Sequence, residues 1–352
     1  MGHVAPLSGP DRAPGERARQ GILIAVEEAN AEIDPSTKRR IVVFHGDSRG
    51  EETGPVALRL ITVNGVIAIL GGSQAAEIDS LATAMRPYSV PLVALGGWQP
   101  PAADNFIFPI GLPAGLQAQV LARFAFEPLK LTRIALIEND DDKRALPDRA
   151  QSQTLSSAFG RSFRQSGGTI VAELSFKNRN DLKGLVGSLE AKKPEAVLLA
   201  GVAEDLTALR AAGLDQKLPL LFAGPDGSAE SQRTNPMASG VYFVTAFVSD
   251  ATPQAQTFSS KYKDRFGELP DVHSALAYDG ARLLCETIHQ SKAVDGARLR
   301  QTLTETKSFE SLTGPVSWEA SKGAGRAGFV VRIEDGHVRM LKRFEPEATK
   351  KD

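Results

Sequence analysis

The chain has 352 residues, of which 42% are hydrophobic and 24% charged, a composition typical of a globular protein large enough for two domains. Its 41 basic and 42 acidic residues nearly cancel, so the charge predicts neither a nucleic-acid partner nor attraction to an anionic membrane. The single cysteine, Cys285, excludes a disulfide within the chain.

The first hundred residues alternate short apolar runs with amphipathic segments, which is the pattern of parallel α/β units. We expect strands at 4–7, 41–45, 66–70 and 91–95. Apolar residues that recur on one helical face from Ala18 to Ile33 predict a helix after the first strand, and a shorter helix is expected at 75–84.

The segment "DNFIFPIG" interrupts this rhythm, after which a second unit of similar size follows. Its strands are expected at 133–138, 169–174, 196–200, 218–223 and 241–245, with helices near 151–165, 181–191 and 205–212. Further helices are expected at 254–266, 274–291 and 298–306. The last stretch, "GFVVRIEDGHVRMLKRF", alternates about Asp335-Gly336, which predicts a β-hairpin with a type I′ turn.

Two features of the chain bear on its location. Cys285 has helical spacing from Ala277, Ala281 and Ile288, so we expect a buried structural thiol, which does not identify a redox compartment. No run approaches the roughly 18 apolar residues of a membrane span. The first strand is expected almost at the start of the chain, which fits a cytosolic protein or the mature form of an exported one; we favour the exported form.

Ligands of open parallel sheets bind at the carboxyl ends of the strands, where helix N-termini present free N–H groups. We expect Ser73 at the N-cap of the next helix, where it would bind a carboxylate or only cap that helix. Trp98 lies among glycines and prolines and would stack on a ligand or pack against Pro100. Asp226, in "AGPDGS", would meet an ammonium group or only form a turn.

Motifs of phosphate binding and catalysis are missing from the sequence. Gly9, Gly15 and Gly21 stand six apart, which fits neither a Walker loop nor a dinucleotide fingerprint. The histidines form no H-E-x-x-H pair, and Ser73 lacks the final glycine of a nucleophile elbow. The three aspartates at 140–142 lack the glycine and distal glutamate of an EF-hand. We therefore predict no enzyme activity, no cofactor and no metal.

Eight segments follow one another along the chain: "APLSGP", "AVEEAN", "VIAILGGSQAAE", "PLVALGG", "RIALIEN", "LRAAGL…LPLLFAGPDG", "HSALAYDGARLL" and "LTGPVSWEASKG". In this order they resemble periplasmic ligand-binding proteins of the branched-chain amino acid (leucine/isoleucine/valine-binding) ABC transporter family. The resemblance implies the α/β type I periplasmic binding fold, with two Rossmann-like doubly wound lobes joined by three hinge crossovers. The first lobe would comprise 1–111 and 250–325, and the second 112–249 with the terminal hairpin at 326–352.

The resemblance also implies ligand contacts in the first lobe. Ser73 would hold the ligand carboxylate, Gly96 and Gly97 would form a turn that contributes backbone groups, and Trp98 stands where the family has a carboxylate-holding threonine. Ser8 and Pro10 would border the cleft at the end of the first strand. Pro14 stands where the family brings an aromatic side chain over the ligand, so one wall of the usual pocket differs.

In the second lobe, the resemblance gives Asp226 the ligand ammonium. The tyrosines that the family presents from this lobe are missing: "IENDDDKRALPD", which contains Asn139, offers no aromatic side chain, and Val202 stands where a hydroxylated ring is expected. These departures leave an aromatic carboxylate, an amide or a larger amino acid open as ligands.

The function implied is that of a periplasmic or extracytoplasmic solute-binding protein that captures an amino acid or related small carboxylate by hinge closure. Its partners would be that ligand and the ABC permease subunits in the membrane, and we expect a monomer. The alternative is a cytosolic amide-type sensor with the same fold. A repressor is set aside, because its helix-turn-helix would precede the first strand, and only three residues precede Val4.

Overall fold

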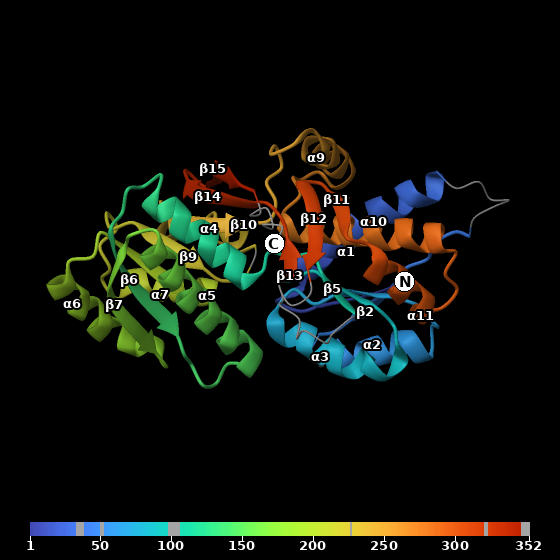
Figure 1. Ribbon diagram of the computed structural model, residues 1–352, viewed down its shortest axis with the longest axis horizontal. Helices are drawn as coiled ribbons and strands as arrows, with labels where there is room; N and C mark the ends of the chain where they lie inside the picture. Colours follow the sequence, from blue (N-terminus) through green and yellow to red (C-terminus); the bar gives the residue numbers. More distant parts are fainter. Residues whose placement is uncertain (33–38, 50–52, 98–105, 226, 320–322, 346–352) are drawn as a thin grey trace. The chain divides into compact units, whose positions relative to one another are not determined.

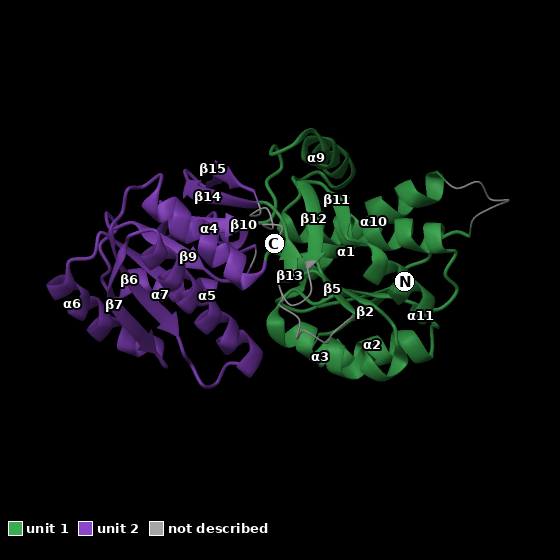
Figure 2. Ribbon diagram, viewed as in Figure 1, with its two compact units in different colours: residues 1–112, 246–327 green, residues 113–245, 328–352 purple. Residues whose placement is uncertain are grey.

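A computed structural model of the chain describes residues 1–32, 39–49, 53–97, 106–225, 227–319 and 323–345 (Figure 1). The chain forms two compact units, the first from 1–112 and 246–327 and the second from 113–245 and 328–352 (Figure 2). Each unit is therefore assembled from segments that lie far apart in the sequence.

The first unit is built on a parallel sheet with the strand order β2-β1-β3-β4-β5. These strands are β1 (Gly2–Ala5), β2 (Phe44–Asp47), β3 (Ile69–Gly71), β4 (Leu92–Ala94) and β5 (Ile107–Pro109). Val4, Ile69 and Leu92 are almost completely buried, as expected of a sheet that is covered on both faces.

Helices cover both faces of this sheet. α1 (Arg12–Ala31) packs along α10 (Val272–Ser291), and α2 (Thr53–Thr62) packs along α3 (Ala75–Met85) on the other side of the sheet (Figure 1). The unit also contains the short 3-10 helix η1 (Arg86–Tyr88), α9 (Pro253–Phe266) and α11 (Gly296–Glu305). Gly21 brings α1 and α10 close together, since a Cβ added there would lie 2.0 Å from the carbonyl oxygen of Ser274.

A small antiparallel sheet completes the first unit. It consists of β11 (Ser308–Ser311), β12 (Gly314–Glu319) and β13 (Gly323–Gly325). The indole Nε1 of Trp318 donates a hydrogen bond of 2.7 Å to the carbonyl oxygen of Pro109, and the Trp318 ring meets Phe108 edge to face. The small sheet is thereby attached to the end of β5.

A buried arginine links the segments where the chain enters and leaves the first unit. Arg326 is 2% exposed, and its guanidinium donates to the carbonyl oxygens of Ile110 and Ala246 and to the hydroxyl of Thr313. Asp279 supplies negative charge nearby; burial raises the pKa of Asp279 to about 7, and the charge of Arg326 opposes that rise. Arg326 thus connects the segments that contain Ile110, Ala246 and Thr313 within the first unit.

The second unit is built on a mixed sheet with the order β15-β14-β10-β9-β8-β6-β7. Its strands are β6 (Arg133–Asn139), β7 (Thr169–Phe176), β8 (Ala196–Ala200), β9 (Leu220–Ala223), β10 (Tyr242–Thr245), β14 (Gly328–Glu334) and β15 (His337–Phe344). The predicted hairpin is confirmed, because β14 and β15 pair about Asp335 and Gly336. These two residues have φ values of 51° and 73°, as a type I′ turn requires.

The helices of the second unit precede or separate its strands in sequence. They are α4 (Ala114–Phe126), α5 (Leu146–Gln165), α6 (Leu182–Lys192), α7 (Ala203–Ala211) and α8 (Ser228–Gln232), with 3-10 turns η2 (Arg179–Asp181) and η3 (Pro236–Ala238). α4 packs along α5. Over the described ranges of both units, no helix combines the length and the apolarity needed to cross a membrane.

Some elements differ from the sequence prediction. The strand expected at 41–45 begins only at Phe44, and "DNFIFPIG", interpreted as an interruption, contains the buried strand β5. α2, α4 and the small sheet were not predicted. α1 begins at Arg12 and not near Ala18, because Pro14 falls within the first turn, where a missing N–H costs the helix nothing.

Candidate functional site

The start of α3 is organised differently from the prediction. Gln74 is the N-cap, so the prediction that Ser73 caps this helix is wrong. Glu77 turns back over the first turn, and its Oε2 accepts hydrogen bonds from the Ser73 N–H at 2.7 Å, the Ser73 hydroxyl at 2.9 Å and the Gln74 N–H at 3.2 Å. Both donors that Ser73 would offer to a ligand are therefore bound to a side chain of the same helix.

The loop after β4 lies directly against this turn. The Gly96 N–H donates to the carbonyl oxygen of Gly72 at 2.8 Å, and a Cβ added at Gly96 would lie 2.5 Å from the Ser73 carbonyl oxygen. A Cβ added at Gly111 would lie 2.5 Å from the Gly97 nitrogen. The structure thus brings Ser73, Gly96 and Gly97 to one edge of the first sheet, and glycine is needed for the close approach.

The loop after β1 is closed by a carboxylate from the neighbouring strand. The hydroxyl of Ser8 donates to Asp47 Oδ2, and the Leu7 N–H donates to Asp47 Oδ1 at 2.9 Å. These hydrogen bonds, that of Ser8 above all, lower the pKa of Asp47. Gly9 has a φ of +84°, which lets the backbone turn here, and Pro10 is exposed and offers no donor.

The second unit joins its two predicted residues through an aspartate that sequence reasoning missed. Asp205 is fully buried; its Oδ2 accepts from Asn139 Nδ2 at 2.6 Å and from the Val202 N–H at 2.9 Å. Its Oδ1 accepts from Arg179 Nε at 2.8 Å. The available signal was the position of Asp205, three residues after the Val202 N-cap, as Glu77 is three residues after Gln74.

Three internal carboxylates therefore occupy the polar donors at the predicted site positions. Ser8 is bound to Asp47, Ser73 to Glu77, and Asn139 and Val202 to Asp205. The predicted positions Trp98 and Asp226 lie outside the described residues, so their roles stay predictions.

A hollow of about 490 Å³ lies beside the loop after β1 in the first unit. Its lining comes from Leu7, the first half of α1 and the segment before α10. Arg17 lines it and pairs with Glu268, another lining residue, at 2.6 Å. This hollow is at the carboxyl edge of the sheet, because α1 begins there.

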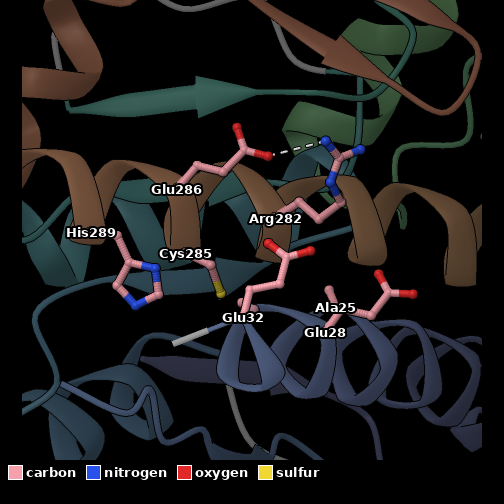
Figure 3. A pocket seen from close by; sticks show the side chains of 8 residues that line it. Ala25, Glu28, Glu32, Arg282, Cys285, Glu286 and His289 are labelled. Carbon is pink, nitrogen blue, oxygen red and sulfur yellow. Dashed lines mark hydrogen bonds and ion pairs between the residues drawn. The ribbon is translucent and has the colours of Figure 1, made fainter. Parts of the chain in front are cut away.

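A second hollow, of about 200 Å³, lies between the later halves of α1 and α10 (Figure 3). It contains Cys285, which is 1% exposed, so the predicted buried thiol is confirmed. Burial raises the pKa of Cys285 to about 12, which keeps the thiol protonated and a poor nucleophile. Arg282 turns away to pair with Glu286 at 3.0 Å. The hollow lies toward the amino ends of the strands, since α1 runs back from the carboxyl edge.

The described residues contain no cluster of three or more histidine, cysteine, aspartate or glutamate side chains suited to hold a metal ion. In the aspartate run, Asp141 Oδ1 accepts from the Lys143 N–H at 3.0 Å, and Asp140 lies 3.6 Å from Arg149. These contacts are those of a capped surface turn.

Comparison with known proteins identifies the family. A family model described as periplasmic binding protein matches residues 1–337. Leu/Ile/Val-binding protein homolog 7 of Brucella melitensis is 26% identical over 347 residues, which cover 94% of this chain and 84% of that protein.

Solved structures agree in fold. The branched-chain amino acid transporter substrate binding protein LivJ from Streptococcus pneumoniae, in complex with isoleucine, has a TM-score of 0.79 at 22% identity and covers 98% of this chain and 99% of its own. An ABC transporter solute binding protein from R. palustris, in complex with benzoate, has a TM-score of 0.76 at 18% identity, covering 98% and 96%. These similarities confirm the predicted fold class. With nearly the whole chain matched by the family model, the chain belongs to the periplasmic binding protein family.

Proposed function

We propose that this protein is the extracytoplasmic solute-binding component of an ABC importer and that it captures a small molecule such as an amino acid, an aromatic carboxylate or an amide. The observation that carries the proposal is the family match over residues 1–337, together with two α/β units of the corresponding fold. The relatives named above bind isoleucine and benzoate, which supports this range of ligand classes.

The proposed mechanism is hinge closure. A ligand that contacts both lobes stabilises the closed form over the open form by the difference in its affinity for the two. Permease subunits in the membrane would then recognise the closed form. No covalent bond is made or broken, so the chain needs no nucleophile, and the protonated Cys285 fits that requirement.

Two of the predicted ligand contacts are kept in this proposal. Asp226 receives an ammonium or other donor of the ligand, and Trp98 forms an aromatic wall. Ser73 can take a ligand carboxylate only when Glu77 leaves its Oγ and N–H, because both are bound to Glu77 now.

The alternative, a cytosolic amide sensor with the same fold, lacks comparable support. The named relatives with a transport description are substrate-binding components of ABC transporters.

A thermal-shift screen tests the proposal. The purified protein, freed of bound compounds by unfolding and refolding, is heated with leucine, phenylalanine, benzoate, benzamide and, as a negative control, ATP. A ligand at a hundred times its dissociation constant adds about 2.7 kcal/mol of stability, so the melting temperature should rise and saturate for one class of compound. If none of these compounds or their close analogues raises it, small-molecule capture of this kind is contradicted.

A further inference from the structure

We infer that Glu77 determines ligand specificity by occupying the carboxylate position at the start of α3, so that the ligand presents an N–H donor there, as an amide or an amine does, and not a free carboxylate. The inference rests on the proposed function, since it concerns the ligand of the same site. The inference selects, among the proposed ligand classes, those that bring an N–H donor to the first unit.

The geometry at α3 shows that Glu77 binds the donors that Ser73 would offer to a ligand. Glu77 Oε2 accepts three hydrogen bonds, two from Ser73 and one from Gln74, at 2.7 to 3.2 Å. This is the arrangement that an external carboxylate would adopt at a helix N-terminus. A ligand carboxylate therefore finds these donors already bound.

The remaining oxygen of Glu77 is the group that a ligand can reach. Glu77 is partly exposed, and within the described ranges its Oε1 accepts no hydrogen bond and has no ion-pair partner. An ammonium or amide N–H can donate to Oε1 without disturbing the turn. A carboxylate would meet like charge at the same place, and like charges a few ångströms apart repel.

The second unit offers an internal comparison. β8 lies beside β6 as β3 lies beside β1, and α7 follows β8 as α3 follows β3. Asp205 occupies the matching third helical position, but it is fully buried and its charge is paired with Arg179. Of the two carboxylates, Glu77 is the one that leaves negative charge accessible.

Donors at the loop after β1 follow the same rule. Asp47 already accepts hydrogen bonds from Ser8, Leu7 and Arg49, so this neighbouring loop has no spare hydroxyl for a ligand anion either. At both loops the serine hydroxyl is therefore held by an internal carboxylate and is not offered to a ligand anion.

The test uses pairs of compounds that differ at one group: leucine with leucinamide, and benzoate with benzamide. Their dissociation constants are measured by calorimetry on the wild-type protein and on Glu77→Ala. We expect the wild-type protein to bind the amide of the preferred pair at least tenfold more tightly. Glu77→Ala releases the donors of Ser73 and Gln74, so the carboxylate should gain at least tenfold in affinity and the preference should reverse.

Two further variants separate specificity from helix stability. Glu77→Gln keeps a hydrogen-bond acceptor for the turn but removes the negative charge. It should therefore lower the affinity for leucinamide, which carries an ammonium group, more than the affinity for the neutral benzamide. Asp295→Ala removes a capping carboxylate from α11, where Oδ1 accepts from the Arg298 N–H at 2.8 Å, and it should leave both affinities unchanged. Equal or tighter binding of the carboxylate by the wild-type protein, with no gain in Glu77→Ala, would overturn the inference while leaving the proposed function intact. Absence of binding by every compound to every variant would instead count against the proposed function.

Discussion

At the scale of single residues, His3 and His45 illustrate how burial decides protonation. They face each other from β1 and β2, with the two Nδ1 atoms 3.0 Å apart. His3 is completely buried; that burial, followed by the charges of His45 and Arg19, lowers the pKa of His3 to about 3. Burial also lowers the pKa of His45. Both imidazoles are therefore neutral in the folded protein at neutral pH.

This pair predicts acid sensitivity. Histidine in the unfolded chain has a pKa near 6.5. Between pH 6.5 and pH 3, His3 is therefore protonated in the unfolded chain and neutral in the folded protein. The contribution of neutral His3 to the free energy of unfolding is fully present above pH 6.5. Below that pH it falls by about 1.4 kcal/mol per pH unit. Urea unfolding at pH 7, 6 and 5 measures the slope. His3→Gln should reduce it and the exposed His337→Gln should not; an unchanged slope in His3→Gln would contradict the assignment.

The candidate site shows which residue properties can be predicted from sequence. The sequence predicts which polar residues lie at or just after the end of a strand, and Ser8, Ser73 and Asn139 were selected in this way. Their partners depend on side-chain rotamers and on contacts between distant segments. Asp205 reaches Asn139 from 66 positions further along the chain, and no local pattern signals that pairing.

At the scale of elements, the pairing of α1 with α10 depends on one small residue. A Cβ at Gly21 would meet the Ser274 carbonyl oxygen at 2.0 Å, so a larger side chain must separate the two helices. A Cβ at Gly187 on α6 would meet nothing within 4 Å. The same substitution should therefore have opposite effects on the two helices.

Gly21→Ala should lower the free energy of unfolding by about 2 kcal/mol, since overpacking outweighs the better helix propensity of alanine. Gly187→Ala should raise it by about 0.5 to 1 kcal/mol, because alanine restricts the unfolded chain and fits the helix. Chemical denaturation of both variants at one pH measures these changes. Equal stability of Gly21→Ala and the wild-type protein would show that the helices do not depend on this close approach.

Helix starts were predicted poorly for two long helices, since α1 and α5 begin six and five residues before the predicted positions. The strand at 196–200 and the helices α3 and α9 agree with the prediction to within a residue at each end. β5 has three residues and the strands of the small sheet are also short, so neither shows a period. Their structure depends on tertiary contacts such as the Trp318 hydrogen bond to Pro109.

At the scale of the whole molecule, the fold was predictable because two similar α/β units repeat the same alternation of elements. The network around Arg326 was not, because it joins Ile110, Ala246 and Thr313 from three separate parts of the chain. Arg326 thereby holds these segments together within the first unit.

The measurement that tests the central claim most directly is small-angle X-ray scattering of the purified protein with and without a saturating amount of the compound that raises its melting temperature most. If the protein captures its solute by closing two lobes, the radius of gyration should fall on binding and the pair-distance distribution should narrow. A compound that binds and saturates while both quantities stay unchanged would contradict capture by hinge closure.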